Sequence, residues 1–234
     1  MRCLELISQH RLVAILRLDD LATAVQLSRS LLDAGIVAQE YTLTNPRALE
    51  AIAEVLREVP EFSNGEATIG VGSVRTQTQA QAAIEAGAQF LVSPIYQPCI
   101  ISVGVQQGVP VMSGAMTPTE IAAAWEAGAA LVKVFPARSL GPKYISDVLA
   151  PMPELKLMPT GGVGLENMQE YFKAGASAVG IGGTLIEMSA LRLAHWDRIT
   201  EVASEFAKRA MKANEQVKPV VEMMASEQEV PKQR

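Results

Sequence analysis

The sequence predicts a (β/α)₈ barrel of the TIM-barrel type, a single α/β domain preceded by a short N-terminal helix. Eight short apolar runs alternate with segments of helical character along the 234 residues. Strands that alternate with helices form parallel βαβ units, and eight such units in about 250 residues make a barrel. In addition, an Ala-Gly pair precedes four of the apolar runs, where the glycine would end a helix that turns back into the sheet. A doubly wound open sheet, which the same alternation permits, is the alternative.

The eight strands are expected where apolar and β-branched residues follow one another over a few positions. The first of these runs begins at Leu12 and stops before Arg17. In chain order, the predicted strands cover residues 12–16, 36–42, 68–72, 90–93, 109–112, 131–135, 155–159 and 178–181.

Helices are expected between these runs, where apolar residues recur at helical spacing or a capping residue opens the segment. Asp19 and Asp20 are candidate caps for the helix that ends at Gly35, and Asn45-Pro46 would supply the N-cap and first residue of the next helix. Residues 117–120, Thr-Pro-Thr-Glu, have the pattern of a capping box. The other helices are expected at about 4–9, from 76, from 98, and at about 142–149, 166–174 and 196–217.

The domain organisation follows from where this alternation stops. Residues 1–217 are assigned to the barrel. Residues 218–234 are rich in Pro, Glu, Lys and Gln, so we expect them to form a flexible polar tail.

Composition excludes several classes of partner and cofactor. The formal charge of -5 and the absence of a long basic run argue against nucleic-acid and anionic-membrane surfaces. No apolar run approaches the ~20 residues of a membrane helix, and no signal-peptide core follows the N-terminus. Two cysteines are too few for a disulfide framework, which favours a cytoplasmic protein. His10 and His195 lack further ligands at metal spacing, so we expect chemistry without metal or cofactor.

One lysine interrupts the sixth apolar run. Lys133 shares a strand face with Leu131 and Phe135, because side chains alternate along a strand. An ammonium in an apolar layer is costly, and burial favours the neutral amine, which is a nucleophile. The alternatives are a structural ion pair, or a lysine whose stem packs while its head reaches water.

Two further charges lie on strands that lead to the same end of the barrel. Arg17 ends the face that it shares with Val13 and Ile15, and Glu40 lies within the second strand. Active groups of such barrels gather at the carboxyl ends of the strands. An arginine there is suited to clamp a carboxylate with two parallel donors. A salt bridge between Arg17 and Glu40 at the rim is the structural alternative.

Two glycine-rich loops complete the predicted site. Residues 160–164 follow the seventh strand and residues 180–184 follow the eighth, where many barrels bind phosphate through backbone N–H groups. Residues 70–73 and 93–94 bring small polar residues and a rigid turn to the same rim, where they could also be turn residues alone.

These features resemble the 4-hydroxy-2-oxoglutarate (KHG) and 2-dehydro-3-deoxy-6-phosphogluconate (KDPG) aldolase family over about residues 4–211. The resemblance implies a homotrimeric barrel in which Lys133 forms a Schiff base with a 2-keto-4-hydroxy acid and Glu40 is the general acid/base. The motifs that carry it are Val13-Ala14-Ile15-Leu16-Arg17, Glu40-Tyr41-Thr42-Leu43-Thr44, Gly70-Val71-Gly72-Ser73-Val74, Val92-Ser93-Pro94, Leu131-Val132-Lys133-Val134-Phe135-Pro136, Pro159-Thr160-Gly161-Gly162-Val163 and Gly180-Ile181-Gly182-Gly183.

The resemblance also implies the remaining contacts with substrate. The residues assigned to pyruvate and its carboxylate are Arg17, Thr44, Ser73, Pro94, Phe135 and Thr160. Those assigned to phosphate are Gly161, Gly162, Gly182, Gly183 and Thr184. Many members carry arginine at position 44, whereas this chain has threonine there and Arg17 at the end of the first strand. Serine also replaces the usual threonine at position 73.

The expected activity is cleavage of KDPG to pyruvate and glyceraldehyde 3-phosphate, of KHG to pyruvate and glyoxylate, or of both. The alternative is an aldolase for the galactonate epimer, because residues 140–144 resemble that branch too. A phosphate-binding barrel isomerase or epimerase, and a phosphate-binding barrel without catalysis, are further alternatives.

Overall fold

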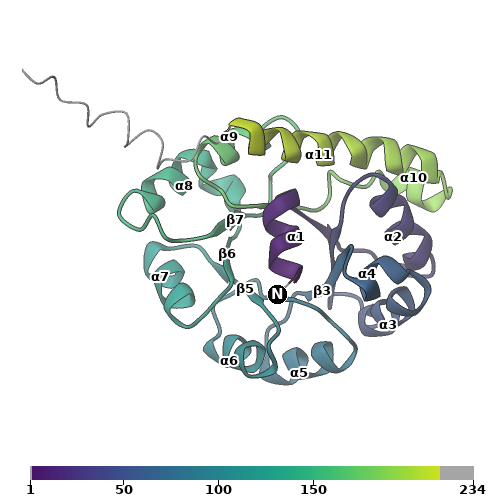
Figure 1. Cartoon of the computed structure of the whole chain (residues 1–234), viewed down its shortest axis with the longest axis horizontal. Coiled ribbons are helices and arrows are strands. Elements are labelled where there is room, and N and C mark those ends of the chain that lie inside the picture. The colour runs from purple at the N-terminus through teal and green to yellow at the C-terminus, as the bar shows by residue number, and fades with distance from the viewer. Residues whose placement is uncertain (1, 217–234) are drawn as a thin grey trace, which may run out of the picture.

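The computed structural model describes residues 2–216, which form the predicted barrel (Figure 1). All eight strands are parallel, and they follow the order β7-β6-β5-β4-β3-β2-β1-β8. A single bridge between Thr160 and Gly180 joins β7 to β8 within the described residues. The strands are β1 Leu12–Leu16, β2 Ala38–Thr42, β3 Thr68–Gly72, β4 Leu91–Val92, β5 Val111–Ala115, β6 Leu131–Val134, β7 Leu157–Pro159 and β8 Val179–Ile181.

Most of the strands lie within their predicted ranges, and β5 differs most. It begins after Pro110, which has no backbone N–H to donate, and extends through Ser113, Gly114 and Ala115. This extension carries too few apolar side chains to read as a strand. A side chain at Gly114 would collide with the backbone of Pro94, so the glycine allows β5 to approach the loop after β4.

Helices surround the barrel. Several of them are shorter than predicted, and the structure contains more helices than the sequence predicts. The short helices α4 and α10 and the 3₁₀ turn η1 were not predicted. The bounds are α1 Arg2–His10, α2 Ala24–Asp33, α3 Ala48–Glu58, α4 Pro60–Asn64, α5 Gln77–Glu85, α6 Pro98–Gln107, α7 Pro118–Glu126, η1 Ala137–Ser139, α8 Gly141–Leu149, α9 Met168–Lys173, α10 Met188–Arg192 and α11 Trp196–Gln216.

The predicted helix ends are confirmed, whereas two predicted helix starts are wrong. Each glycine of the repeated Ala-Gly pairs follows a helix with a positive φ of 87° to 99°. The Thr117–Glu120 capping box forms. However, the carboxylate of Asp20 accepts the N–H of Ala22, and Asn45 accepts the N–H of Arg47, so both close turns instead of capping helices. As a result, α2 and α3 begin later than expected.

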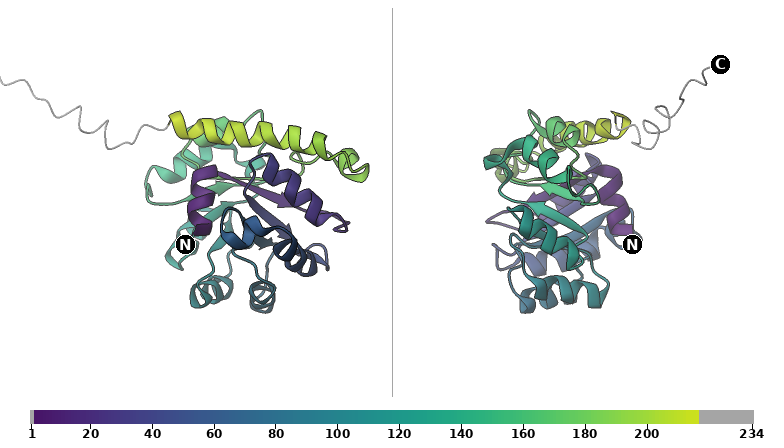
Figure 2. Two further views of the ribbon diagram at one scale, coloured as in Figure 1. Left: turned by 45° about the vertical axis from the view of Figure 1, so that its right-hand side comes forward. Right: turned by 90° about the vertical axis from the view of Figure 1, so that its left-hand side faces the viewer.

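Helix α1 covers the amino-terminal end of the barrel (Figure 1). Ile7 packs there among interior residues that include Val13, Phe90 and Leu131. On the outside, α11 packs against α2 and α9 (Figure 2). The carboxyl end of the barrel is therefore the end left for a site. None of the helices in residues 2–216 is long and apolar enough to cross a membrane. The tail predicted at 218–234 lies outside the described residues, as does the predicted barrel end at 217.

Candidate active site

Lys133 projects into the barrel from β6. Its neighbour on the same face, Leu131, belongs to the interior core, while Val132 and Val134 pack in the layer between strands and helices. The lysine is only 5% exposed. Its Nζ lies 3.9 Å from Oε1 of Glu40 and 5.5 Å from the centre of the Phe135 ring. The predicted interior position of Lys133 is thus confirmed, while its role as a nucleophile remains a prediction.

Glu40 projects from β2 toward this amine and is 1% exposed. Neither carboxylate oxygen has a hydrogen-bond partner among the described residues. A side chain at Gly72 would overlap Oε1, so glycine at this position makes the room that the carboxylate occupies. Burial raises the pKa of Glu40, while the charges of Lys133 and Arg17 oppose that rise. A carboxyl group that keeps its proton to a higher pH than usual is suited to exchange protons with a substrate.

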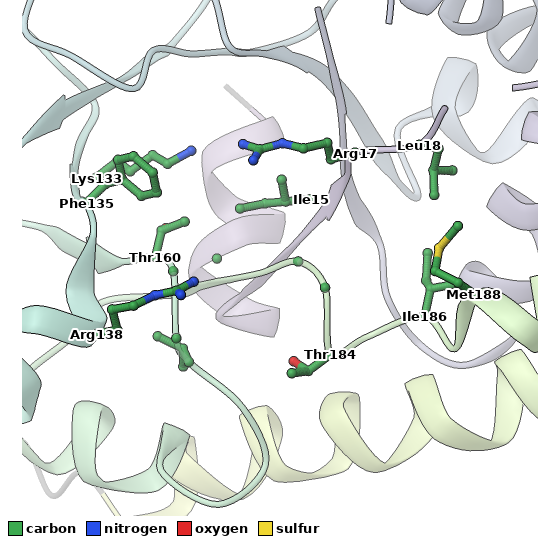
Figure 3. A pocket seen from close by; sticks show the side chains of 16 residues that line it. Ile15, Arg17, Leu18, Lys133, Phe135, Arg138, Thr160, Thr184, Ile186 and Met188 are labelled. Atoms are coloured by element: carbon green, nitrogen blue, oxygen red, sulfur yellow. The ribbon is translucent and has the colours of Figure 1, made fainter. Parts of the chain in front are cut away.

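Arg17 follows β1 directly and reaches the same space. In Figure 3, its guanidinium and the amine of Lys133 point toward each other from opposite walls. Among the ion pairs within residues 2–216, the partner of Glu40 is Lys133 and not Arg17. The salt bridge between Arg17 and Glu40, which was the structural alternative, therefore does not form among residues 2–216.

A cavity of about 460 Å³ opens beside these groups at the carboxyl ends of the strands. Among residues 2–216, its lining contains three cationic side chains and no carboxylate, so it is suited to an anionic ligand. Nine of the predicted site residues line it: Arg17, Lys133, Phe135, Thr160, Gly161, Gly162, Gly182, Gly183 and Thr184. Among residues 2–216, no group of three His, Cys, Asp or Glu side chains is placed to hold a metal ion.

The glycines of the two loops have different surroundings. Gly161 and Gly162 have φ of 85° and 86°, and side chains on them would meet the Phe135 ring and the Cβ of Arg138. At Gly183, by contrast, a side chain would meet nothing within 4 Å, because this residue borders open space in the cavity. The first loop is thus shaped by neighbouring protein, and the second leaves room for a ligand.

Besides Glu40, three predicted residues are placed outside this lining, as far as residues 2–216 define it. The hydroxyl of Thr44 forms a hydrogen bond of 2.7 Å with that of Thr42. Ser73 follows β3 with a φ of 60°. Pro94 contributes the backbone that approaches Gly114. Their predicted contacts with pyruvate remain predictions.

Sequence reasoning missed other residues of the cavity, above all Arg138. It lies in η1, five positions after Lys133, and its side chain enters the cavity (Figure 3). The rule that carboxyl ends of strands carry the site would have found this charge, because η1 directly follows β6. The missed apolar residues of the lining include Ile15, Ile186 and Met188.

Comparison with known proteins relates the whole barrel to one family. The family model described as KDPG and KHG aldolase matches residues 4–202. The 2-dehydro-3-deoxy-phosphogluconate aldolase of Treponema pallidum is 38% identical over 168 residues, which cover 71% of this chain and 78% of that protein.

Two solved structures have the same fold over most of their length. One, described as "Native KDPGal structure", is 30% identical with a TM-score of 0.79 and covers 87% of this chain and 96% of its own. The other is the KDPG aldolase of Legionella pneumophila with pyruvate captured as a covalent carbinolamine intermediate. That structure is 26% identical with a TM-score of 0.78, and the match covers 86% of this chain and 96% of its own. On the family match and these identities, the chain belongs to the KDPG and KHG aldolase family.

Proposed function

We propose that this chain is a class I aldolase, a lyase that cleaves 2-dehydro-3-deoxy-6-phosphogluconate to pyruvate and glyceraldehyde 3-phosphate through a Schiff base on Lys133. The observation that carries the proposal is the buried amine at the edge of a cavity lined by cationic side chains, with the carboxylate of Glu40 at 3.9 Å. The relative from Legionella pneumophila, captured with covalent pyruvate, supports the same chemistry.

The reaction begins when the neutral amine of Lys133 attacks the C2 ketone of the substrate. Arg17 holds the neighbouring carboxylate, since its guanidinium faces the amine across the cavity. The attack gives a carbinolamine, and its hydroxyl takes up a proton from solvent and leaves as water, which gives a protonated imine. The positive charge of this imine makes it an acceptor for the electron pair that carbon–carbon cleavage releases.

Glu40 then moves the protons. Its carboxylate removes the proton of the C4 hydroxyl, directly or through a water molecule, and the C3–C4 bond breaks to give the aldehyde and an enamine. Glu40 returns the proton to C3, and water hydrolyses the imine to release pyruvate and the free lysine. A positioned acid/base of this kind contributes roughly 10²–10⁴-fold to the rate.

The two glycine loops are proposed to hold the phosphate of the sugar acid. A second substrate, 4-hydroxy-2-oxoglutarate, would give pyruvate and glyoxylate by the same steps, and the cationic lining of the cavity supports its two carboxylates. The galactonate epimer is a third candidate, supported by the likeness to the structure described as KDPGal. Measuring kcat/KM for the cleavage of each of these three compounds would show which one is the preferred substrate.

Assembly and location complete the proposal. A homotrimer is supported by the family to which the chain belongs. Ile95 and Met116 are 44% and 39% exposed after β4 and β5, and their apolar side chains favour burial against another copy. A cytoplasmic location is supported by the small number of cysteines. Light scattering would give about three times the 25.0 kDa chain mass for the trimer.

Reduction with borohydride in the presence of pyruvate tests the central step. The wild-type protein is expected to gain the mass of one reduced pyruvate imine per chain, located on Lys133 by peptide mass spectrometry. Lys133→Met should lose both this mass and KDPG cleavage, because Lys133 supplies the amine in the lining of the described cavity.

Lys208→Met is the matched control, since Lys208 is exposed on α11 and pairs with Glu205. It should react as the wild type does. A barrel without a catalytic amine, whether an isomerase or a binding protein, would not be trapped at all. An adduct that persists in Lys133→Met would show that the nucleophile is misassigned.

A further inference from the structure

Arg138 is a cation of the cavity that the proposed reaction does not use. It lies in η1, its side chain is exposed, and it belongs to the cavity lining. Within residues 2–216, no carboxylate forms an ion pair with its guanidinium. A charge that points into a cavity and has no counter-ion in the described protein is available to a ligand.

Backbone contacts hold Arg138 against the first glycine loop. Its N–H donates to the carbonyl of Gly161 at 2.7 Å, and the N–H of Ala137 donates to Thr160 at 2.8 Å. A Cβ on Gly162 would lie 2.4 Å from the Cβ of Arg138, so the arginine stem and the loop are packed as closely as glycine allows. The backbone and Cβ of Arg138 are therefore fixed beside the loop that is proposed to bind phosphate, and the guanidinium extends from there into the cavity.

The three cations of the lining are divided between two regions of the cavity. In Figure 3, Lys133 and Arg17 lie on one side of Thr160, while Arg138 and Thr184 lie on the other. The keto acid of the substrate occupies the first region, because its carbonyl reacts with Lys133. A second anionic group on the same substrate would then reach the region of Arg138.

We propose that Arg138 determines specificity by binding the phosphate at the far end of the substrate. This inference rests on the proposed function. Backbone N–H groups of the glycine loops provide neutral donors, whereas a guanidinium adds a full charge and two parallel N–H donors that match a phosphate. Arg138 thus favours phosphorylated sugar acids over the same acids without phosphate.

Steady-state kinetics of Arg138→Met on two substrates test this role. The KM for KDPG is expected to rise roughly 10- to 100-fold with little change in kcat, because a charge-assisted contact to a group remote from the reacting bond is lost. For the unphosphorylated sugar acid, kcat/KM should stay at the wild-type value. Arg138→Lys should restore part of the KM, because it keeps the charge without the paired donors.

Arg57→Met is the matched control for loss of one exposed guanidinium. Arg57 pairs with Glu58 at the end of α3 and does not line the cavity. It should leave both substrates unaffected. An unchanged KM for KDPG in Arg138→Met would overturn the inference. An equal loss with both substrates would also overturn it, since it would indicate that Arg138 only shapes the cavity.

Two measurements separate this inference from the proposed function. Pyruvate trapping by borohydride depends on Lys133 and should proceed in Arg138→Met as in the wild type; its failure in the wild type would contradict the aldolase. Calorimetric titration with inorganic phosphate requires no turnover and should show affinity reduced about tenfold or more in Arg138→Met. Equal phosphate affinity in both proteins would contradict the role of Arg138, whatever the reaction.

Discussion

Lys133 and Glu40 both lie in the interior of the barrel, and the distance between them fits a catalytic pair better than a stabilising ion pair. At 3.9 Å their atoms are beyond ordinary hydrogen-bond length, and the carboxylate oxygens have no other partner among residues 2–216. Such a pair compensates poorly for the cost of removing two charges from water. The arrangement is better explained by a substrate that enters between these groups and exchanges protons with them.

The substitution Glu40→Gln tests whether Glu40 is the general acid/base. The amide keeps the shape but cannot accept the C4 hydroxyl proton, so kcat for KDPG cleavage should fall about 10²–10⁴-fold. Pyruvate trapping on Lys133 should remain, because the amine is intact. A variant that cleaves as fast as the wild type would remove Glu40 from the mechanism. One that loses trapping as well would assign Glu40 to imine formation or to the fold.

The raised pKa of Glu40 predicts the acid side of the pH profile. A raised carboxyl pKa means that the proton is retained above pH 4.5, the ordinary value, and the base form appears only as pH increases further. The kcat for cleavage should therefore rise with pH through a transition above 4.5. That rise should be absent from the residual activity of Glu40→Gln. If both proteins show the same transition, another group is responsible for it.

The positions of Lys133, Arg17 and Glu40 were predictable because alternation along a strand fixes the face on which a side chain lies. Nine predicted residues line the cavity for this reason or because they follow β7 and β8. Arg138 was not predictable in the same way. A 3₁₀ turn of three residues has no period from which a direction can be derived, and the position of its Cβ beside Gly162 appears only in the fold.

At the scale of the elements, local hydrogen bonds decide where helices begin. Asp20 and Asn45 each accept a backbone N–H two residues ahead, which closes a turn and delays the helix. Thr117 instead accepts the N–H of Glu120 three residues ahead and caps α7. Asp, Asn and Thr are all suited to both roles, so the type of the accepting residue does not by itself separate a turn from a cap. The cap of α7 was predictable because Glu120 reciprocates.

Thr117→Ala is expected to destabilise the protein by about 1 kcal/mol, the usual cost of a lost N-cap. For a barrel of this size, Tm should fall by roughly 2–4 °C, measured by thermal unfolding. Thr119→Ala is the control, because Thr119 is exposed within the same helix turn. The cap explanation would be contradicted if both substitutions had the same effect.

The stabilisation that Glu120 contributes to this cap should weaken at low pH. Hydrogen bonds from the backbone of Met116 and Thr117 lower the pKa of Glu120 below its ordinary 4.5. A lowered pKa stabilises the fold above the ordinary value, and this contribution disappears as pH falls through the lowered one. The difference in Tm between wild type and Glu120→Gln should accordingly shrink as pH falls below 4.5. A difference that persists to low pH would have another cause.

For the whole molecule, the joint between β7 and β8 is, with the joint between β3 and β4, one of two places in the described barrel where neighbouring strands pair at a single position. A single bridge, Thr160 to Gly180, closes it within the described residues, whereas β2 and β3 pair over five positions. Both glycine loops begin at this joint. A ligand bound to the two loops would therefore connect two strand edges that the backbone connects at a single position.

Inorganic phosphate should stabilise the barrel at this joint. At 100 times its Kd, the ligand contributes about 2.7 kcal/mol, which corresponds to a rise in Tm of roughly 5–10 °C. Amide exchange should slow more at residues 160–162 and 180–183 than in β3, and Arg138→Met should show less of both effects at the same concentration. Protection confined to other strands would place the phosphate elsewhere.

Helix α1 lies across one end of the barrel, and the cavity opens at the other. Products formed in the described cavity therefore share one exit, with the covalently held fragment innermost. The aldehyde must depart first and pyruvate second, so in the direction of carbon–carbon bond formation the keto acid has to enter before its partner. The order of release thus follows from the covalent bond to Lys133, while the helix at the opposite end of the barrel only leaves the two products a common exit.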